Sequence, residues 1–135
     1  MTLGLRSGER QLSPEALQTR ICRAAAGLRA MGVHAGDAIG LLARNDFPFV
    51  ETSLAAQRLG MYPVPINWHF KAEEVAYVLA DSGAKLLIGH SSLLRAVAGA
   101  PPAGLPIIEV KTSPEIAAAY GREADAPLPD AIEYE

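Results

Sequence analysis

The chain has 135 residues, of which half are hydrophobic and only 6% aromatic, and its formal net charge is −3. This length and composition fit one ordinary domain with a sizeable apolar core, built from helices on a buried sheet rather than from an aromatic-rich β-sandwich. A negative balance without a Lys/Arg cluster excludes the basic patch that nucleic-acid binders present, so no nucleic-acid partner is expected.

Cysteine content and hydropathy indicate the cellular compartment in which the protein is expected. The single cysteine, Cys22, rules out an internal disulfide and a C-x-x-C site, and its place in a helical pattern predicts a small, partly buried side chain. No apolar run reaches the roughly 18 residues that a membrane-spanning helix needs, so no transmembrane segment is expected. The first residues lack the apolar centre of a signal peptide, and the sequence predicts a cytoplasmic protein.

A hairpin and a helix are the first elements predicted along the chain. Alternating leucines in residues 3–12, around a Ser-Gly pair at 7–8, are typical of a β-hairpin. The Ser-Pro-Glu run at 13–15 then gives a helix N-cap, a proline at the first helical position and an acid in the first turn. Gly32 is expected to end this helix. Its predicted inward-facing residues are Leu17, Ile21, Ala24, Leu28 and Met31.

Strands and helices alternate in the middle of the chain. Residues 38–43 predict a strand buried on both faces, and Asp46 is expected to cap a helix that ends at Gly60. The segment 62–67 is strand-like, but its two prolines cannot donate to a ladder, so an edge position is expected. The predicted apolar stripe of the intervening helix is Phe47, Val50 and Leu54.

The same alternation continues beyond this segment. A helix is predicted over residues 72–81, a buried strand over 85–89, a short helix capped by Ser91, and a strand over 107–110. The residues of the first of these helices that are expected to face inward are Val75, Val78 and Leu79.

Strict alternation of helix and strand with short connections predicts an α/β fold. We expect a parallel sheet with helices on both faces, flavodoxin-like or doubly wound, preceded by the hairpin. A second Ser-Pro-Glu run at 113–115 predicts one more helix. Residues 1–122 are therefore expected to form the α/β unit. Residues 123–135, proline-rich and acidic without periodicity, are expected to be a loop or disordered tail.

Parallel sheets of this kind bind ligands beyond the carboxyl ends of their strands. Those ends are predicted at residues 44–46, 67–70 and 90–91. The second contains the only tryptophan, Trp68, beside His69. A loop tryptophan can form the wall of a pocket or cover the edge of a core, and a histidine can carry a proton near neutral pH. No nucleophile or orienting acid accompanies His69, so we assign no catalytic residue. Trp68 and His69 are expected to be either structural residues of this loop or part of the rim of a substrate pocket.

Other signatures of chemistry are absent from the sequence. There is no dinucleotide-binding, P-loop or hydrolase motif. The three histidines lie in separate loops without ligand spacing, so no metal site is expected. Glu73 and Glu74 diverge by about 100° on a helix and cannot face each other as a catalytic pair. They are expected to complement the positive end of the helix dipole.

Several segments together resemble the early part of the AMP-forming acyl-CoA synthetases, within the adenylate-forming superfamily. That family commonly shows a helix ending in a G-V-x-x-G-D run, a short apolar strand, an asparagine, a helix ending in glycine and a V-P-x-N segment. The corresponding positions are residues 26–37, residues 38–43, Asn45, Gly60 and residues 64–67. The run EEVAYVLADSGAKLLI matches the next helix and strand, and the resemblance extends over residues 8–94, closer to fatty-acyl ligases than to amino-acid-activating domains.

The resemblance implies a ligase that joins a carboxylic acid, expected to be a fatty acid, to coenzyme A. ATP and the acid give an acyl-adenylate and pyrophosphate, with Mg²⁺ offsetting charge, and CoA then displaces AMP. The family's Ser/Thr/Gly-rich loop ending in lysine does not occur in this sequence. No catalytic residue of the family is carried over, and the chain by itself is expected to bind no cofactor and to be inactive.

The sequence is accordingly interpreted as an N-terminal, truncated part of such a ligase. Because a cut domain exposes former interior, self-association through its exposed faces is expected. A free-standing flavodoxin-like binding or interaction domain without catalysis is the alternative. Lys71 departs from the family, which often has Thr or Ser there as a helix N-cap, so a weaker helix start is expected, by roughly 1 kcal/mol.

Overall fold

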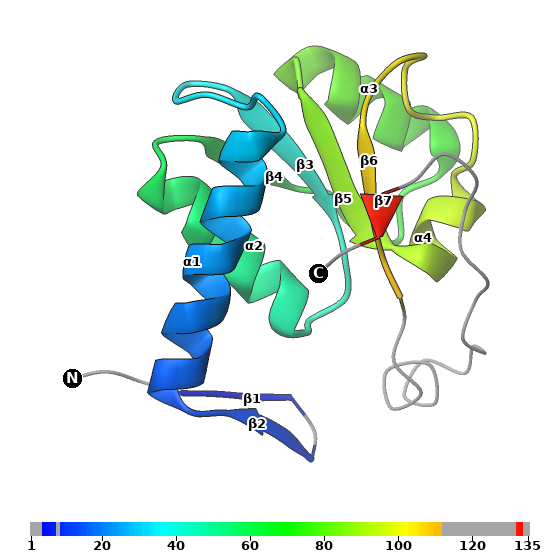
Figure 1. Ribbon diagram of the computed structural model, residues 1–135. Helices are drawn as coiled ribbons and strands as arrows, with labels where there is room; N and C mark the ends of the chain where they lie inside the picture. The colour runs from blue at the N-terminus through cyan, green and yellow to red at the C-terminus, as the bar shows by residue number, and fades with distance from the viewer. Residues whose placement is uncertain (1–3, 8, 112–131, 134–135) are drawn as a thin grey trace.

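The structure, a computed structural model, describes residues 4–7, 9–111 and 132–133. Figure 1 shows an α/β body with a small hairpin beside the start of the first helix. The strands are β1 (Leu5–Ser7), β2 (Arg10–Leu12), β3 (Ala38–Leu42), β4 (Tyr62–Pro65), β5 (Leu86–His90), β6 (Ile107–Val110) and β7 (Ile132–Glu133). The helices are α1 (Pro14–Ala30), α2 (Phe47–Arg58), α3 (Ala72–Ser82) and α4 (Ser91–Ala96).

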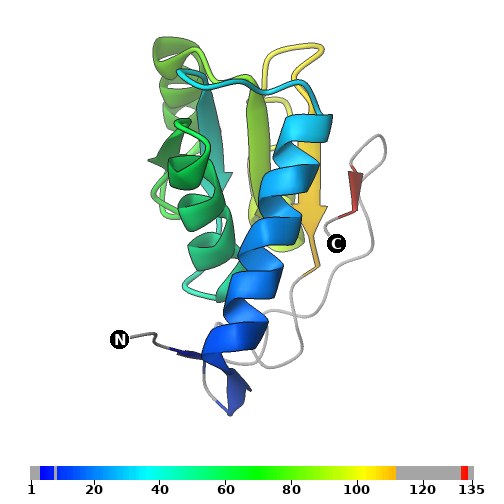
Figure 2. The ribbon, with the colours of Figure 1, turned by 60° about the vertical axis from the view of Figure 1, so that its left-hand side comes forward.

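Five of these strands form one parallel sheet in the order β4-β3-β5-β6-β7. Helices α1 and α2 lie side by side over one face, and α3 and α4 lie on the other (Figures 1 and 2). The predicted α/β architecture with an additional hairpin is therefore confirmed. None of the helices within the described residues is long and apolar enough to cross a bilayer.

The hairpin pairs β1 with β2 antiparallel, with Leu5 opposite Leu12 and Ser7 opposite Arg10. Ser7, which the sequence placed in the turn, thus belongs to the strand. Leu5 and Leu12 pack against the core under α1. The hairpin is consequently attached to the domain by apolar contact as well as by the chain.

Helix α1 begins as predicted, because Ser13 accepts a hydrogen bond from the N–H of Ala16 at 3.1 Å. The centre of its stripe falls on Ala25 rather than Ala24, which is only partly buried. Cys22 is exposed, so its expected partial burial is wrong. Its position next to the buried Ile21 turns the thiol about 100° away from the core. The buried residues of α1 are Leu17, Ile21, Ala25 and Leu28.

The predicted apolar stripe of α2 is largely wrong. Leu54 is 39% exposed and Val50 only partly buried, whereas Glu51 is completely buried. The helix is enclosed by the sheet on one side and α1 on the other, so two adjacent rows of residues face protein. A charged residue in one of those rows hides the pattern from periodicity alone. The buried residues are Phe47, Pro48, Glu51, Thr52, Ala55 and Ala56.

On the opposite face, α3 buries Val75 and Leu79 and partly buries Val78, as predicted. Its first turn is better anchored than the lysine N-cap suggested. The Glu74 carboxylate reaches back and accepts a hydrogen bond from the backbone N–H of Lys71 at 3.1 Å. The acid therefore supplies one half of a capping box that needs no acceptor on the lysine.

The two outer strands of the sheet are β4 and β7, and only the first was predicted. Strand β4 lies at the edge, as its prolines predicted. Its alternate N–H groups face β3, with Tyr62 donating to Asp37 at 2.8 Å, so the prolines occupy outward positions where a donor is not needed. Residues 132–133, expected in a loop or tail, instead pair as β7 with β6. The helix predicted at 113–115 and the rest of the expected tail lie outside the described residues.

Candidate functional site

Three strand ends meet at the carboxyl edge of the sheet, as the sequence predicted. The parallel register places the ends of β3, β4 and β5 next to one another. Arg44, just after β3, donates its backbone N–H to Nδ1 of His90 at the end of β5, at 3.0 Å. Its guanidinium carbon lies 3.9 Å from the ring centroid of Trp68, in the loop after β4. One arginine therefore connects all three strand ends.

Trp68 and His69 lie in a short loop with a defined shape. The N–H of His69 bonds to Oδ1 of Asn67 at 2.9 Å, and the N–H of Phe70 bonds to the carbonyl of Asn67 at 2.9 Å. The indole is 38% exposed and stacks on the imidazole of His69, with centroids 3.5 Å apart and planes 30° from parallel. Contact with both Arg44 and His69 makes the indole a packed component of this edge rather than an open platform.

Asp46 is the second junction at this edge. One of its oxygens, Oδ1, accepts from the backbone N–H of Phe47 at 2.8 Å, which is the predicted helix cap, and from Nη2 of Arg10 at 2.5 Å. The other oxygen, Oδ2, lies 3.6 Å from Nε2 of His90, a distance at which the contact is electrostatic. The hairpin, α2 and β5 therefore converge on a single carboxylate.

The environment of Asp46 keeps it ionised. Burial alone would raise the pKa of this carboxyl group, because a low dielectric disfavours the charged form. The neighbouring imidazole of His90, the N–H of Phe47 and the guanidinium of Arg10 all favour the anion, and together they hold the pKa below its ordinary value. Asp46 is consequently a carboxylate anion whose charge is balanced by its neighbours, and it is not a proton donor.

His90 is completely buried, and neither ring nitrogen is open to a ligand. Since Nδ1 accepts the N–H of Arg44, the hydrogen-bond network assigns the ring proton to Nε2, which faces Asp46. Ser91, expected to cap α4 with its side chain, is also buried, and its hydroxyl donates a hydrogen bond to Oε1 of Glu109 at 2.5 Å. His90 is the N-cap residue of α4 instead, and its side chain forms no capping hydrogen bond. These groups stabilise the edge and are not placed as a nucleophile and base.

The described residues do not fit a metal site. Each buried carboxylate has a protein partner: Asp46 contacts Arg10, Glu51 contacts Arg20, and Glu109 contacts Ser91. Within the same residues there is no group of three or more His, Cys, Asp or Glu side chains that could hold a metal ion. We therefore derive no reaction step through ATP, Mg²⁺ or coenzyme A at these positions.

Sequence reasoning found the edge but missed its main polar residues. It placed residues 44–46 and 90–91 there without singling out Arg44 or His90. Arg44 directly follows one apolar run, and His90 ends another. No local signal identifies Arg10 as a partner of Asp46, because the two are 36 positions apart.

Comparison with known proteins now decides the family. A family model described as AMP-binding enzyme matches residues 4–131. The chain belongs to the AMP-binding enzyme family. The predicted relationship to the N-terminal part of AMP-forming acyl-CoA synthetases is thereby confirmed, as the following relatives also show.

Similar sequences include CoA ligases. The chain is 39% identical to a feruloyl-CoA synthase of Amycolatopsis sp over 84 residues, covering 62% of this chain and 17% of that protein. It is 36% identical to the medium/long-chain-fatty-acid–CoA ligase FadD6 of Mycobacterium tuberculosis over 94 residues, covering 70% and 16%. The chain thus spans less than a fifth of the length of these curated relatives.

Solved structures of the family share the fold. The anthranilate CoA ligase AuaEII, in complex with anthranoyl-AMP, superimposes with a TM-score of 0.74 at 22% identity, over 93% of this chain and 22% of that chain. A benzoate CoA ligase from Burkholderia xenovorans gives a TM-score of 0.72 at 26% identity, over 92% and 25%. The fold of this chain is therefore shared with parts of these two CoA ligases.

Proposed function

We propose that this chain supplies the N-terminal α/β unit of an ATP-dependent, AMP-forming acid–CoA ligase. The reaction of that ligase converts a carboxylic acid, ATP and coenzyme A into acyl-CoA, AMP and pyrophosphate through an acyl-adenylate. The observation that carries the proposal is the family match over residues 4–131, together with CoA ligases at 36% and 39% identity. A cytoplasmic location goes with this proposal and is supported by the reduced state expected of a lone cysteine.

The unit acts as a scaffold in this proposal. Its buried carboxylates are neutralised by protein partners, and its sequence contains no phosphate-binding loop. ATP, Mg²⁺ and coenzyme A are therefore held by parts of the ligase outside this sequence, and the unit by itself does not activate acids. Trp68 and His69 form part of the rim of the substrate pocket, which is supported by their position at the carboxyl edge of the sheet.

A fatty acid is the proposed substrate class. The support is the similarity to the fatty-acid–CoA ligase of Mycobacterium tuberculosis, which extends over 70% of this chain. A feruloyl-CoA synthase is similar over a shorter stretch. Aromatic acids such as ferulate are therefore the comparison that an activity screen must include.

A chimeric ligase tests the proposal. The matching N-terminal segment of the Amycolatopsis feruloyl-CoA synthase is replaced by residues 4–131 of this chain, and formation of feruloyl-CoA is followed. We expect turnover, because the scaffold has the family fold. A folded chimera that forms neither the adenylate nor feruloyl-CoA would contradict the proposal and favour a free-standing binding domain.

A further inference from the structure

We propose that Arg44 is a positioning residue, whose guanidinium holds the loop of residues 67–70 in place at the carboxyl edge of the sheet. The inference concerns a stack of three side chains, in which Arg44 contacts Trp68 and Trp68 contacts His69. Its consequence for substrate binding rests on the proposed ligase function, whereas the positioning itself is a property of this chain.

Arg44 is a fixed support for such a contact. The residue is 3% exposed, and its backbone N–H is bonded to the imidazole of His90. That imidazole is itself completely buried and faces the carboxylate of Asp46. The guanidinium therefore extends from a backbone position that is held by the neighbouring strand.

The loop, in turn, has a shape that its own hydrogen bonds define. The two hydrogen bonds that involve Asn67 run within the loop, to His69 and Phe70. The loop is anchored before this turn by Ile66, which is 5% exposed. After Ile66, the next three residues, Asn67, Trp68 and His69, are all exposed. The stack on Arg44 joins the middle of the loop to the end of β3.

The contact favours an arginine over a lysine. A guanidinium is planar and can lie against an indole, whereas a lysine ammonium is a strongly hydrated point charge that loses this stacking area. A cation–π contact of this kind shifts the ratio of docked to undocked loop by roughly two- to thirty-fold. Because His69 stacks on the same indole at 3.5 Å, its position at the rim depends on Arg44 as well.

Trp68 is the only tryptophan of the chain, so its fluorescence reports the loop directly. The test compares wild type with Arg44→Lys, and with Arg23→Lys as a matched control on the exposed side of α1. We expect the rate of acrylamide quenching of Trp68 to rise about two-fold or more in Arg44→Lys, in line with the loss of the stack, and to stay at the wild-type value in the control. An unchanged rate in a folded Arg44→Lys variant would overturn the proposal.

A measurement on wild type keeps the proposal testable if that variant fails to fold. Protons of the Arg44 side chain that lie over the indole are expected to show upfield ring-current shifts in the NMR spectrum. Random-coil shifts for these protons in the folded wild-type chain would overturn the proposal independently of any variant.

The consequence for the ligase is separated from this structural test. In the feruloyl-CoA synthase chimera, Arg44→Lys is expected to raise KM for a substrate while leaving kcat nearly unchanged, since a displaced rim weakens binding rather than chemistry. Equal losses of kcat and kcat/KM would contradict a positioning role. A chimera without any turnover would refute the proposed function, while the quenching result would still decide the role of Arg44.

Discussion

Arg10 and Asp46, 36 positions apart, form an ion pair of 2.5 Å that fixes the hairpin to the start of α2. The Asp46 side chain is 4% exposed and the Arg10 side chain 33% exposed. The same guanidinium lies 4.8 Å from the ring centroid of Phe47, the first residue of α2. This contact joins the hairpin to the edge where β3 ends, and Asp46 also caps α2 and faces His90.

The first expected outcome concerns the pH dependence of stability in Asp46→Asn. The pKa of Asp46 is lowered in the folded state, so its contribution is complete above the unfolded-state pKa of about 4 and is lost as the pH falls through the lower folded-state pKa. The variant should be about 1–3 kcal/mol less stable than wild type at pH 7, because charge-assisted hydrogen bonds are lost. This difference should shrink below pH about 4.

Urea unfolding at a series of pH values measures this difference. Asp81→Asn, at an exposed position of α3, is the matched control and should follow the wild-type pH curve. A stability difference between wild type and Asp46→Asn that is independent of pH would contradict the role given to the carboxylate.

A second outcome concerns the ion pair between α1 and α2. The Glu51 side chain is completely buried and accepts from Nε of Arg20 at 2.5 Å, while the Arg20 side chain is 34% exposed. Removing the arginine leaves a buried charge without this partner, and we expect Arg20→Met to cost about 2–4 kcal/mol. Replacing both residues, as in Arg20→Met/Glu51→Leu, should recover most of that loss, since packed apolar side chains can substitute for a buried pair.

A double-mutant cycle by urea unfolding tests this second outcome. Arg23→Met, at an exposed position of the same helix, should change the free energy of unfolding by less than about 0.5 kcal/mol. If the double variant is no more stable than Arg20→Met, the ion pair is not the source of the loss.

A pair of glycines gives a third outcome. A Cβ added at Gly89 in β5 would lie 2.7 Å from the carbonyl oxygen of Leu42 and 2.9 Å from Leu94, so Gly89→Ala should destabilise by about 1–3 kcal/mol. A Cβ at Gly27 in α1 meets nothing within 4 Å, and Gly27→Ala should stabilise by about 0.5–1 kcal/mol. Thermal unfolding of both variants measures the contrast. Equal melting temperatures would contradict the close approach of the strands and α4.

Sequence patterns predicted most of the architecture because apolar runs and caps are local. The strands β3 and β5, the caps at Ser13 and Asp46, and the edge position of β4 were all accessible in this way. Interactions that depend on distant residues were not. The ion pair of Glu51 with a residue 31 positions away explains both why a charge is buried in α2 and why its stripe was misjudged.

The candidate site shows the same division. Parallel topology predicted that Trp68 and His69 would lie at the carboxyl edge, and they do. The contacts that organise this edge come from Arg44 and His90, whose mutual hydrogen bond spans 46 positions. Neither the stack on Trp68 nor the burial of His90 has a signature in the local sequence, because both follow from the pairing of β3 with β5.

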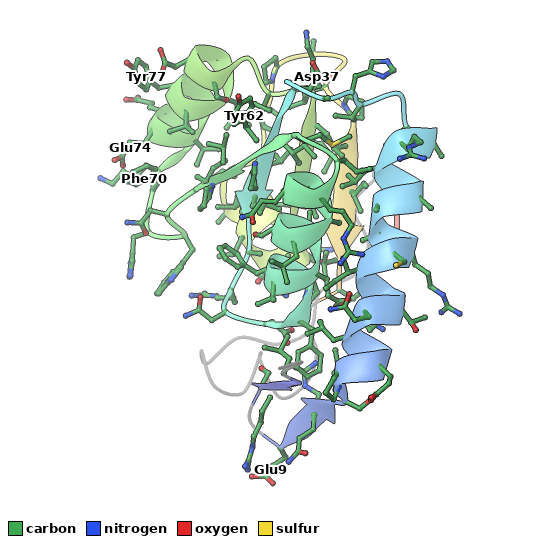
Figure 3. The ribbon with its side chains drawn as sticks, turned by 90° about the vertical axis from the view of Figure 1, so that its left-hand side faces the viewer. Glu9, Asp37, Tyr62, Phe70, Glu74 and Tyr77 are labelled. Carbon is green, nitrogen blue, oxygen red and sulfur yellow. The ribbon has the colours of Figure 1, made fainter. Side chains whose placement is uncertain are left out.

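Exposed aromatic residues lead to a further expectation on self-association. Tyr62 on β4 and Tyr77 on α3 are 65% and 69% exposed, and Figure 3 shows both on the side of the molecule formed by these two elements. Exposed apolar surface of this kind promotes association. Light scattering of the isolated chain should show association that decreases in Tyr62→Ser/Tyr77→Ser. A clean monomer at all concentrations would contradict this expectation.

The isolated chain should show no exchange of labelled pyrophosphate into ATP, with either a fatty acid or ferulate. The described residues place every buried carboxylate against a protein partner, and the sequence contains no phosphate-binding loop. Clear exchange that depends on an added acid would show that the unit is more than a scaffold.

The most direct test of the central claim is the rate of feruloyl-CoA formation by the chimera that carries residues 4–131 of this chain. The account predicts acid-dependent formation of feruloyl-CoA, and inactivation of the same chimera at a lower temperature when it carries the destabilising Gly89→Ala substitution. A chimera that is folded and binds ATP, yet forms no feruloyl-adenylate and no feruloyl-CoA, would contradict the claim that this chain is the N-terminal unit of an acid–CoA ligase.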